Sequence, residues 1–310
     1  MADAGSVNTF SASPTGCGGG RRHGTIAPVR KSRLYPRLST LLSLALAALG
    51  PGPAWTAWAD SELRPAARLI FPYYDVRPGT LTTLFLTNVG TSPVTVQITF
   101  YDQSCLRMGA TTFLSAKDTA ALSVLQFVGD GTTATFRQGF VDVVAGPNSL
   151  VGAATIVNVV EDWAVSYHAA SAKRVSGPSP FEPFPARLAL PGFFASAEGP
   201  RRLDGFLVLV APNPTVAGGI VADEAVRAAF DVILPPSGSR SLTAAGHQLI
   251  LPLSFFAPGA SGSGAGWLTV SNAALDEEGK PLGMVGLFIQ TLVDPAGGGM
   301  AGAVRLWDLR

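Results

Sequence analysis

The first residues to consider for catalysis are a serine and a histidine two positions apart. Ser166 and His168 occur in the run WAVSYHAAS, and strand alternation would place both on one face. These are the residue types that a serine hydrolase pairs. Side chains that neighbour each other on one strand face point alongside one another, however, and no Gly-X-Ser-X-Gly turn occurs to present a nucleophile. We therefore expect His168 to be a strand residue without a catalytic role, and His247 likewise.

Cysteine chemistry is limited to one residue. The chain has two cysteines, and Cys17 lies in a segment that we expect to be removed, so Cys105 would stand alone. A lone cysteine cannot form an intramolecular disulfide. Cys105 is either a small buried hydrophobic residue at a strand end or a free thiol, and no histidine in the local sequence would activate the thiol.

Metal and phosphate sites are not expected. One cysteine and two scattered histidines cannot form a closed zinc site. The acidic run Asp276-Glu277-Glu278-Gly279 lacks the alternating spacing of a calcium loop and is typical of a hairpin turn. The glycine-rich run 259–266 has no following lysine and leads into a strand, so it does not form a phosphate-binding loop. We predict no catalytic residue, no metal and no cofactor, and hence a protein that is not an enzyme.

Aromatic side chains are the remaining candidates for a binding site. Secreted β proteins commonly bind glycans by stacking sugar rings on exposed aromatic rings. The candidates for such a platform are Tyr73, Tyr74, Trp163, Tyr167 and Trp267. The alternative is that these rings fill the core, and this is the interpretation we favour, most firmly for Trp267.

The elements that would carry these residues are β-strands. Only 14% of the residues are charged, and the chain contains 35 glycines and 24 prolines, a composition that suits short strands and tight turns. In 93–101 the apolar side chains alternate with polar ones, as in a sheet with one buried face. Further strands are expected at 111–115, 119–127, 135–145, 151–159 and 163–170. Five prolines in 177–193 indicate an extended connection outside any sheet.

The second part of the chain repeats features of the first. GFLVLVA (205–211) parallels 81–88, and AVRAAFDVIL (225–234), which we interpret as a strand rather than a helix, parallels 94–102. LPLSFF parallels LSVLQF, and a Gly-aromatic-X-X-Val strand followed by an apolar glycine-containing strand occurs in both parts. We therefore predict an all-β fold of two antiparallel immunoglobulin-like β-sandwich units, related by internal duplication. The expected domains are 60–180 and 181–310.

One stretch of sequence carries a resemblance. FPYYDVRPGTLTTLFLTNVGTSPVTVQITFYDQSC (71–105) resembles the start of a loose group of uncharacterised secreted bacterial proteins, which share an FPYYD segment followed by TTL…TN and VTV…YD strands. The resemblance implies a β-sandwich protein of the envelope or the extracellular space with no established activity. It brings no catalytic residues.

Residues 1–59 are expected to be a signal peptide with a polar extension. A basic region with Arg30, Lys31, Arg33 and Arg37 precedes the apolar run LLSLALAAL (41–49). That run is about half the length that a membrane span needs. Ala57 and Ala59 supply the small residues that precede cleavage, which would leave Asp60 as the first residue. The alternative is an uncleaved anchor. Translation starts either at Met1 or near Val29.

Charge then constrains the partners. Six of the 22 basic residues and one of the 21 acidic residues lie in 1–59, so the remainder has 16 basic and 20 acidic residues, a net charge of −4. A weakly acidic chain without a basic cluster is not expected to bind nucleic acid. We expect a periplasmic or extracellular protein with a structural or protein-interaction role, whose partner is an envelope or extracellular protein. The alternative is a carbohydrate-binding module. We expect no transmembrane helix in the mature chain.

The leader assignment gives a direct prediction. Amino-terminal sequencing of the exported protein is expected to begin at Asp60, because Ala57 and Ala59 occupy the positions that signal peptidase reads. Replacing Ala59 with a bulky residue should block this cleavage. An exported form that begins before Asp60 would contradict the assignment.

Overall fold

The computed structural model describes residues 63–103, 106–129, 135–177, 179–195, 202–212, 229–234, 238–243, 247–256, 264–275, 279–293 and 299–309. Eighteen strands and two single-turn helices lie in these ranges. The first nine strands are β1 (Arg68–Asp75), β2 (Thr80–Asn88), β3 (Val94–Asp102), β4 (Arg107–Leu114), β5 (Thr119–Ser123), β6 (Gln138–Ala145), β7 (Leu150–Asn158), β8 (Trp163–His168) and β9 (Ala170–Ala172).

The remaining strands follow in the second half of the chain. They are β10 (Arg187–Ala195), β11 (Arg202–Val210), β12 (Ala229–Leu234), β13 (Gly238–Thr243), β14 (Gln248–Pro252), β15 (Gly264–Asn272), β16 (Val285–Val293), β17 (Met300–Arg305) and β18 (Trp307–Asp308). The helical turns are α2 (Leu125–Val128), after β5, and α3 (Leu253–Phe256), after β14. None of the helices among the described residues is long and apolar enough to cross a membrane.

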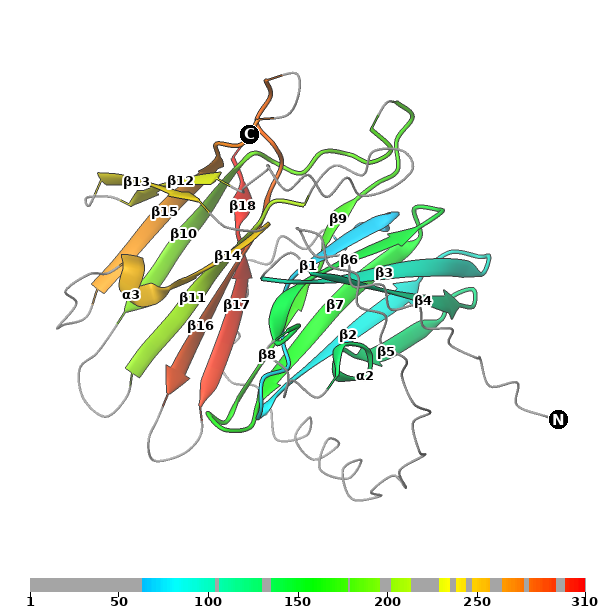
Figure 1. Ribbon diagram of the computed structural model, residues 1–310, viewed down its shortest axis with the longest axis horizontal. Helices are drawn as coiled ribbons and strands as arrows, with labels where there is room; N and C mark the ends of the chain where they lie inside the picture. The colour runs from blue at the N-terminus through cyan, green and yellow to red at the C-terminus, as the bar shows by residue number, and fades with distance from the viewer. Residues whose placement is uncertain are drawn as a thin grey trace.

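The strands form four small antiparallel sheets (Figure 1). We number them sheet I (β4-β3-β6-β1-β9), sheet II (β5-β2-β7-β8), sheet III (β13-β12-β15-β10-β18) and sheet IV (β14-β11-β16-β17). The strand orders of sheets III and IV reproduce those of sheets I and II, with every strand number raised by nine. The two halves of the chain therefore have one topology.

The all-β expectation holds, but the expected pair of immunoglobulin-like sandwiches is wrong. The four small sheets are arranged as the blades of a four-bladed β-propeller. Two independent sandwiches would have two separate cores, whereas the larger apolar cluster here joins sheets I and II to Val208, Leu287 and Ile289 of sheet IV. At the centre of Figure 1, β8 of sheet II lies beside β17 of sheet IV. Strand periodicity shows one buried face per strand and cannot indicate which sheet covers it.

The sequence parallels between the halves fall on equivalent strands. Residues 205–210 lie on β11, the counterpart of β2, and 229–234 forms β12, the counterpart of β3. The start of the expected strand 225–234 lies outside the described residues. Both LSVLQF and LPLSFF change from strand to a helical turn, so the expected strand 119–127 ends at Ser123. The boundaries of the two expected domains stay a prediction.

Strand β1 lies at the centre of the molecule. All eight of its residues are buried, although a strand with one open face would expose every second residue. Its pairing with β6 shifts register between Phe71 and Tyr74, which marks a bulge around Pro72. The second half of the chain closes over this bulge. The Gln248 side-chain amide donates a 2.8 Å hydrogen bond to the Pro72 carbonyl, and the Phe206 ring packs 5.1 Å from the Tyr73 ring.

The proline-rich connection is only partly outside the sheets, because β10 begins at Arg187 and contains Pro191. The expectation that prolines exclude this stretch from a sheet was therefore wrong. Pro191 lies at a register shift between Leu190 and Phe193, and β18 pairs only with the start of β10. A proline is tolerated at such a bulge because no ladder hydrogen bond needs its missing N–H. The RLIFPYY of β1 and the RLALPGF of β10 are thus one bulged-strand motif.

The first part of the same connection covers sheet I. The Arg68 guanidinium forms a buried pair with Asp142, with nitrogen–oxygen distances of 3.0 and 2.7 Å. The rings of Phe181 and Phe184 lie 5.6 and 5.9 Å from this guanidinium. The connection therefore shields an ion pair that would lose much of its strength in water.

The Gly-aromatic-X-X-Val motif has a steric explanation. Gly266 pairs with Phe193, and a Cβ atom on Gly266 would lie 2.5 Å from the tip of the Phe193 ring. Gly139 pairs with Tyr74, and its Cβ would meet the backbone carbonyl of Tyr101. In each half a glycine makes room for the aromatic ring that follows the proline bulge.

This geometry predicts different outcomes for the two glycines. Gly266→Ala should reduce the free energy of unfolding by about 1–3 kcal/mol, because the added methyl overpacks against Phe193. Adding Phe193→Leu should recover part of this loss, since the shorter side chain leaves room. Gly139→Ala should cost more and should not be relieved by shortening Tyr74, because the obstacle is backbone. Chemical denaturation measures these variants together with Phe193→Leu alone, and additive losses at 266 and 193 would contradict the assignment.

Candidate functional site

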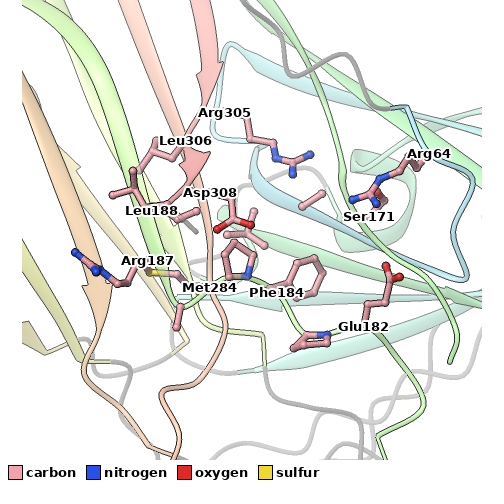
Figure 2. Close-up of a pocket in the computed structure, with 17 residues that line it drawn as sticks. Arg64, Ser171, Glu182, Phe184, Arg187, Leu188, Met284, Arg305, Leu306 and Asp308 are labelled. Carbon is pink, nitrogen blue, oxygen red and sulfur yellow. The ribbon is translucent and has the colours of Figure 1, made fainter. Parts of the chain in front are cut away.

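A cavity lies between the two halves of the chain. It has a volume of about 1040 Å³. One wall comes from the segment around Arg64, from β9 and from the connection at 182–186, and the other comes from β10, β16, β17 and β18. In Figure 2 the guanidinium groups of Arg64 and Arg305 and the carboxylates of Glu182 and Asp308 lie around this space.

The lining of the cavity does not favour one class of ligand. Three arginines (Arg64, Arg187 and Arg305) and two acids line it, so most of the positive charge that could hold an anion is offset locally. Ser171 lines the cavity, but none of its described lining residues is a histidine or a cysteine that could act as a base or a nucleophile. Across the described ranges, three or more His, Cys, Asp or Glu residues nowhere gather closely enough to hold a metal ion. The cavity can bind a small polar molecule, but it shows no catalytic constellation.

A buried polar cluster explains the FPYYD segment. The Arg77 guanidinium binds the Asp75 carboxylate, with its closest nitrogen–oxygen distance at 2.6 Å. The Tyr73 hydroxyl donates to the same carboxylate at 2.9 Å, and the Gln138 amide donates to the Tyr73 oxygen at 2.6 Å. The Thr82 hydroxyl donates to the Asp75 carbonyl and accepts from its N–H. These contacts hold the end of β1 against the start of β2, so the segment is structural.

Four of the five aromatic candidates for the glycan platform are buried. Tyr73 and Tyr74 on β1 are at most 2% exposed, and Trp163 and Tyr167 on β8 are at most 7% exposed. Tyr167 donates a hydrogen bond to the Tyr73 carbonyl at the β1 bulge, and the Trp163 indole N–H donates to Glu161 at 2.8 Å. A ring that stacks on a sugar needs an open face, and none of these four rings has one.

Trp267 is the exception, and here our expectation was wrong. We expected it in the core, yet it is 48% exposed on β15. Gly266 and Leu268 take the inward positions on either side of it, because the Phe193 ring occupies the space over Gly266. The corresponding residue of the first half, Phe140, is 3% exposed and stacks on Tyr101 at 4.6 Å.

The other sequence candidates do not form a site. Ser166 and His168 both lie on the outer face of sheet II, as expected, but the Ser166 hydroxyl bonds to Thr155 at 2.8 Å. Burial lowers the pKa of His247, which favours the neutral ring. Cys105, Asp276–Glu278, the start of the glycine-rich run, and the leader with Ala57, Ala59 and Asp60 lie outside the described residues.

Sheet III carries an exposed aromatic surface that the sequence reasoning missed. Thr269 pairs with Ala189 and with Ile233, and Ala189 pairs with Trp307, so these residues form one outward row. Trp267 lies two residues from Thr269 on the same face. We call the outer face of sheet III formed by Phe194, Ile233, Trp267 and Trp307 the aromatic face; these side chains are 57, 44, 48 and 37% exposed.

Local alternation contained part of this signal. In GWLTVSN, the buried Leu268 and Val270 put Trp267 on the opposite side, and period two alone places it outward. Trp307 gave no such signal, because β18 is only two residues long. The face as a whole depends on the register among four strands, which no local pattern specifies.

Comparison with known proteins does not assign a family. No protein-family model matches the chain, and neither does any curated protein. A crystal structure of Thermotoga maritima 1070 is similar over 34% of this chain and 94% of its own, with 12% identity and a TM-score of 0.31. The match to a crystal structure of the CupB6 tip adhesin from Pseudomonas aeruginosa covers 74% of this chain and 85% of the adhesin chain, with 9% identity and a TM-score of 0.13.

The buried tyrosines predict how stability depends on pH. Burial raises the pKa of Tyr73, Tyr74 and Tyr167 above the usual value of 10.0. The folded state therefore favours the neutral phenol, and this stability is fully present below pH 10 and is lost as the pH rises above it. The free energy of unfolding should fall by up to about 1.4 kcal/mol per pH unit for each group.

Tyrosinate absorbance and circular dichroism measure this transition together. We expect the tyrosinates of Tyr73, Tyr74 and Tyr167 to appear only as the sheets unfold, and Tyr167→Phe to give a shallower dependence of unfolding free energy on pH. Formation of these three tyrosinates near the usual pKa with the sheets intact would contradict the burial of the rings.

Proposed function

We propose that the mature chain is a non-catalytic protein of the periplasm or the extracellular space, exported through its signal peptide, with a structural or protein-interaction role. The aromatic face is its contact surface. The observation that carries this proposal is that four large apolar side chains lie exposed together on one face of sheet III. Contiguous apolar surface of this kind marks interaction sites in soluble proteins.

The equivalent region of the first half supports a protein partner. The counterparts of Ala189, Trp267 and Trp307 are Ile70, Phe140 and Ala170, which are 0, 3 and 1% exposed. These three residues are covered by other parts of the same chain, including the side of sheet IV whose residues belong to the same apolar cluster. The face of sheet I that is equivalent to the aromatic face is thus already covered by protein.

A carbohydrate-binding role is the second candidate. Phe194 pairs with Ala265, two residues from Trp267, so the two rings are diagonal neighbours on the sheet. Two exposed rings on one face are what a glycan platform requires, although the rings differ from those that the sequence suggested. Asp231, with its carboxylate 2.6 Å from the Ser241 hydroxyl, lies on the same face and offers a polar group for sugar hydroxyls.

Site-specific photocrosslinking distinguishes these roles. A photoreactive phenylalanine is placed at Ile233, on the aromatic face, and as a matched control at Phe113, which is 58% exposed on β4 of sheet I. Crosslinking is carried out on intact cells that export the protein. We expect a discrete protein adduct from position 233, none from position 113, and loss of the adduct when Trp267→Ala is added.

Each other result has a defined meaning. An adduct at position 233 that contains carbohydrate instead of protein would favour the second role. Equal adducts at both positions, or none at 233, would contradict the use of the aromatic face as a contact surface.

A further inference from the structure

We propose that a second copy of this chain binds the aromatic face, and that it does so with the outer face of its sheet II, so that copies join head to tail. This inference deepens the proposed contact function and rests on it. It follows from the way in which the two halves of one chain already pack together.

The internal contact pairs two defined surfaces. One is the outer side of β1, where Ile70 is fully buried and the Tyr73 ring meets Phe206. The other is the side of sheet IV that faces away from sheet III, with Val208 and Leu287 in the shared core cluster. The first half thus contributes its bulged strand, and the second half contributes the face of a four-stranded sheet.

Each of these surfaces has a counterpart that is left open. The counterpart of β1 is β10, whose outer side belongs to the aromatic face. The counterpart of sheet IV is sheet II. On sheet II, Leu86 pairs with Gly152, and at the equivalent place on sheet IV, Leu209 pairs with Gly286. Phe85 of sheet II is therefore the counterpart of Val208 of sheet IV.

The outer face of sheet II has the composition of a contact surface. We call it the threonine face; its outward residues on β2 are Leu81, Thr83, Phe85 and Thr87, and Leu81 and Phe85 are 44 and 37% exposed. The outward positions of its neighbours β5 and β7 carry no charge either: they are Thr119, Ala121, Ser123, Val151, Ala153, Thr155 and Val157. Charged residues are depleted in the same way at the centre of protein interfaces.

Two pairs of hydroxyl groups on this face are already hydrogen-bonded to each other. Thr87 and Thr119 hydrogen-bond to each other at 2.9 Å, and Thr155 and Ser166 do so at 2.8 Å. Polar groups that are already hydrogen-bonded to each other cost little free energy when water is removed from them. The threonine face can therefore accept the apolar side chains of the aromatic face.

The two faces differ, so the proposed contact is heterologous. Each copy would use its aromatic face on one neighbour and its threonine face on another, which leaves one face open at each end of the assembly. A twofold dimer would instead use one surface twice. This difference allows the proposal to be tested with variants that each block one face.

The test uses two variants at exposed positions and one control. Trp267→Glu blocks the aromatic face, Phe85→Glu blocks the threonine face, and Phe113→Glu changes an exposed ring outside both. Sedimentation velocity over a wide range of concentrations gives the size of each exported protein, and circular dichroism checks the fold. The unmodified protein and Phe113→Glu should form a concentration-dependent series of oligomers. Each blocked variant should be a monomer, with association weakened about tenfold or more, as for an interface hot spot.

Mixing the two blocked variants is the decisive measurement. Phe85→Glu retains its aromatic face and Trp267→Glu retains its threonine face, so an equimolar mixture should form a one-to-one dimer and nothing larger. A monomeric unmodified protein, an effect of Trp267→Glu without one of Phe85→Glu, or a mixture that stays monomeric would each overturn the proposal. If the unmodified protein is monomeric while position 233 crosslinks to a different protein, self-assembly fails and the proposed contact function stands.

Discussion

The burial of β1 on both sides is the constraint on which the rest of the structure depends. A strand in a two-layer protein has one side for the core and one for water, but β1 has sheet II on one side and sheet IV on the other. Its backbone is bent by the bulge at Pro72, and the Pro72 and Tyr73 carbonyls would be costly to bury alone. Gln248 and Tyr167 donate to these two carbonyls. The bulge is thereby satisfied from both halves of the chain.

The strands themselves could be predicted from sequence because their signals are local. Alternation in 94–102 and the turn residues between runs indicated β3 and its neighbours, and the repeated runs fall on equivalent strands of the two halves. The expectation that Pro191 lies outside any sheet was wrong. A proline cannot donate a ladder hydrogen bond, but it can still occur within a strand at a bulge. The bulged motif shared by β1 and β10 could have been found by comparing RLIFPYY with RLALPGF.

The arrangement of the sheets could not be predicted, since periodicity reports burial without naming the covering partner. Tyr73 and Trp267 illustrate the limit. Both are large aromatic residues, yet one lies under sheet IV and the other faces outward, and the difference arises from packing between halves that are distant in sequence. Equivalent positions of the two halves also differ in their buried partners. Arg68 has Asp142 as a buried partner, whereas Arg187 is exposed and the position equivalent to Asp142 is Thr269.

The shared core also determines when the chain can complete its folding. β1 is the first strand of the described residues, but the side chains that close over its outer side come from β11, β14 and β16. Contacts between such distant segments carry a large loop-closure entropy and form late. The first half of the chain is therefore synthesised before the strands that cover its central strand. β1 is already paired with β6 and β9 in sheet I, but its outer side stays uncovered until these strands have been added. During this interval the chain is most exposed to misfolding and proteolysis.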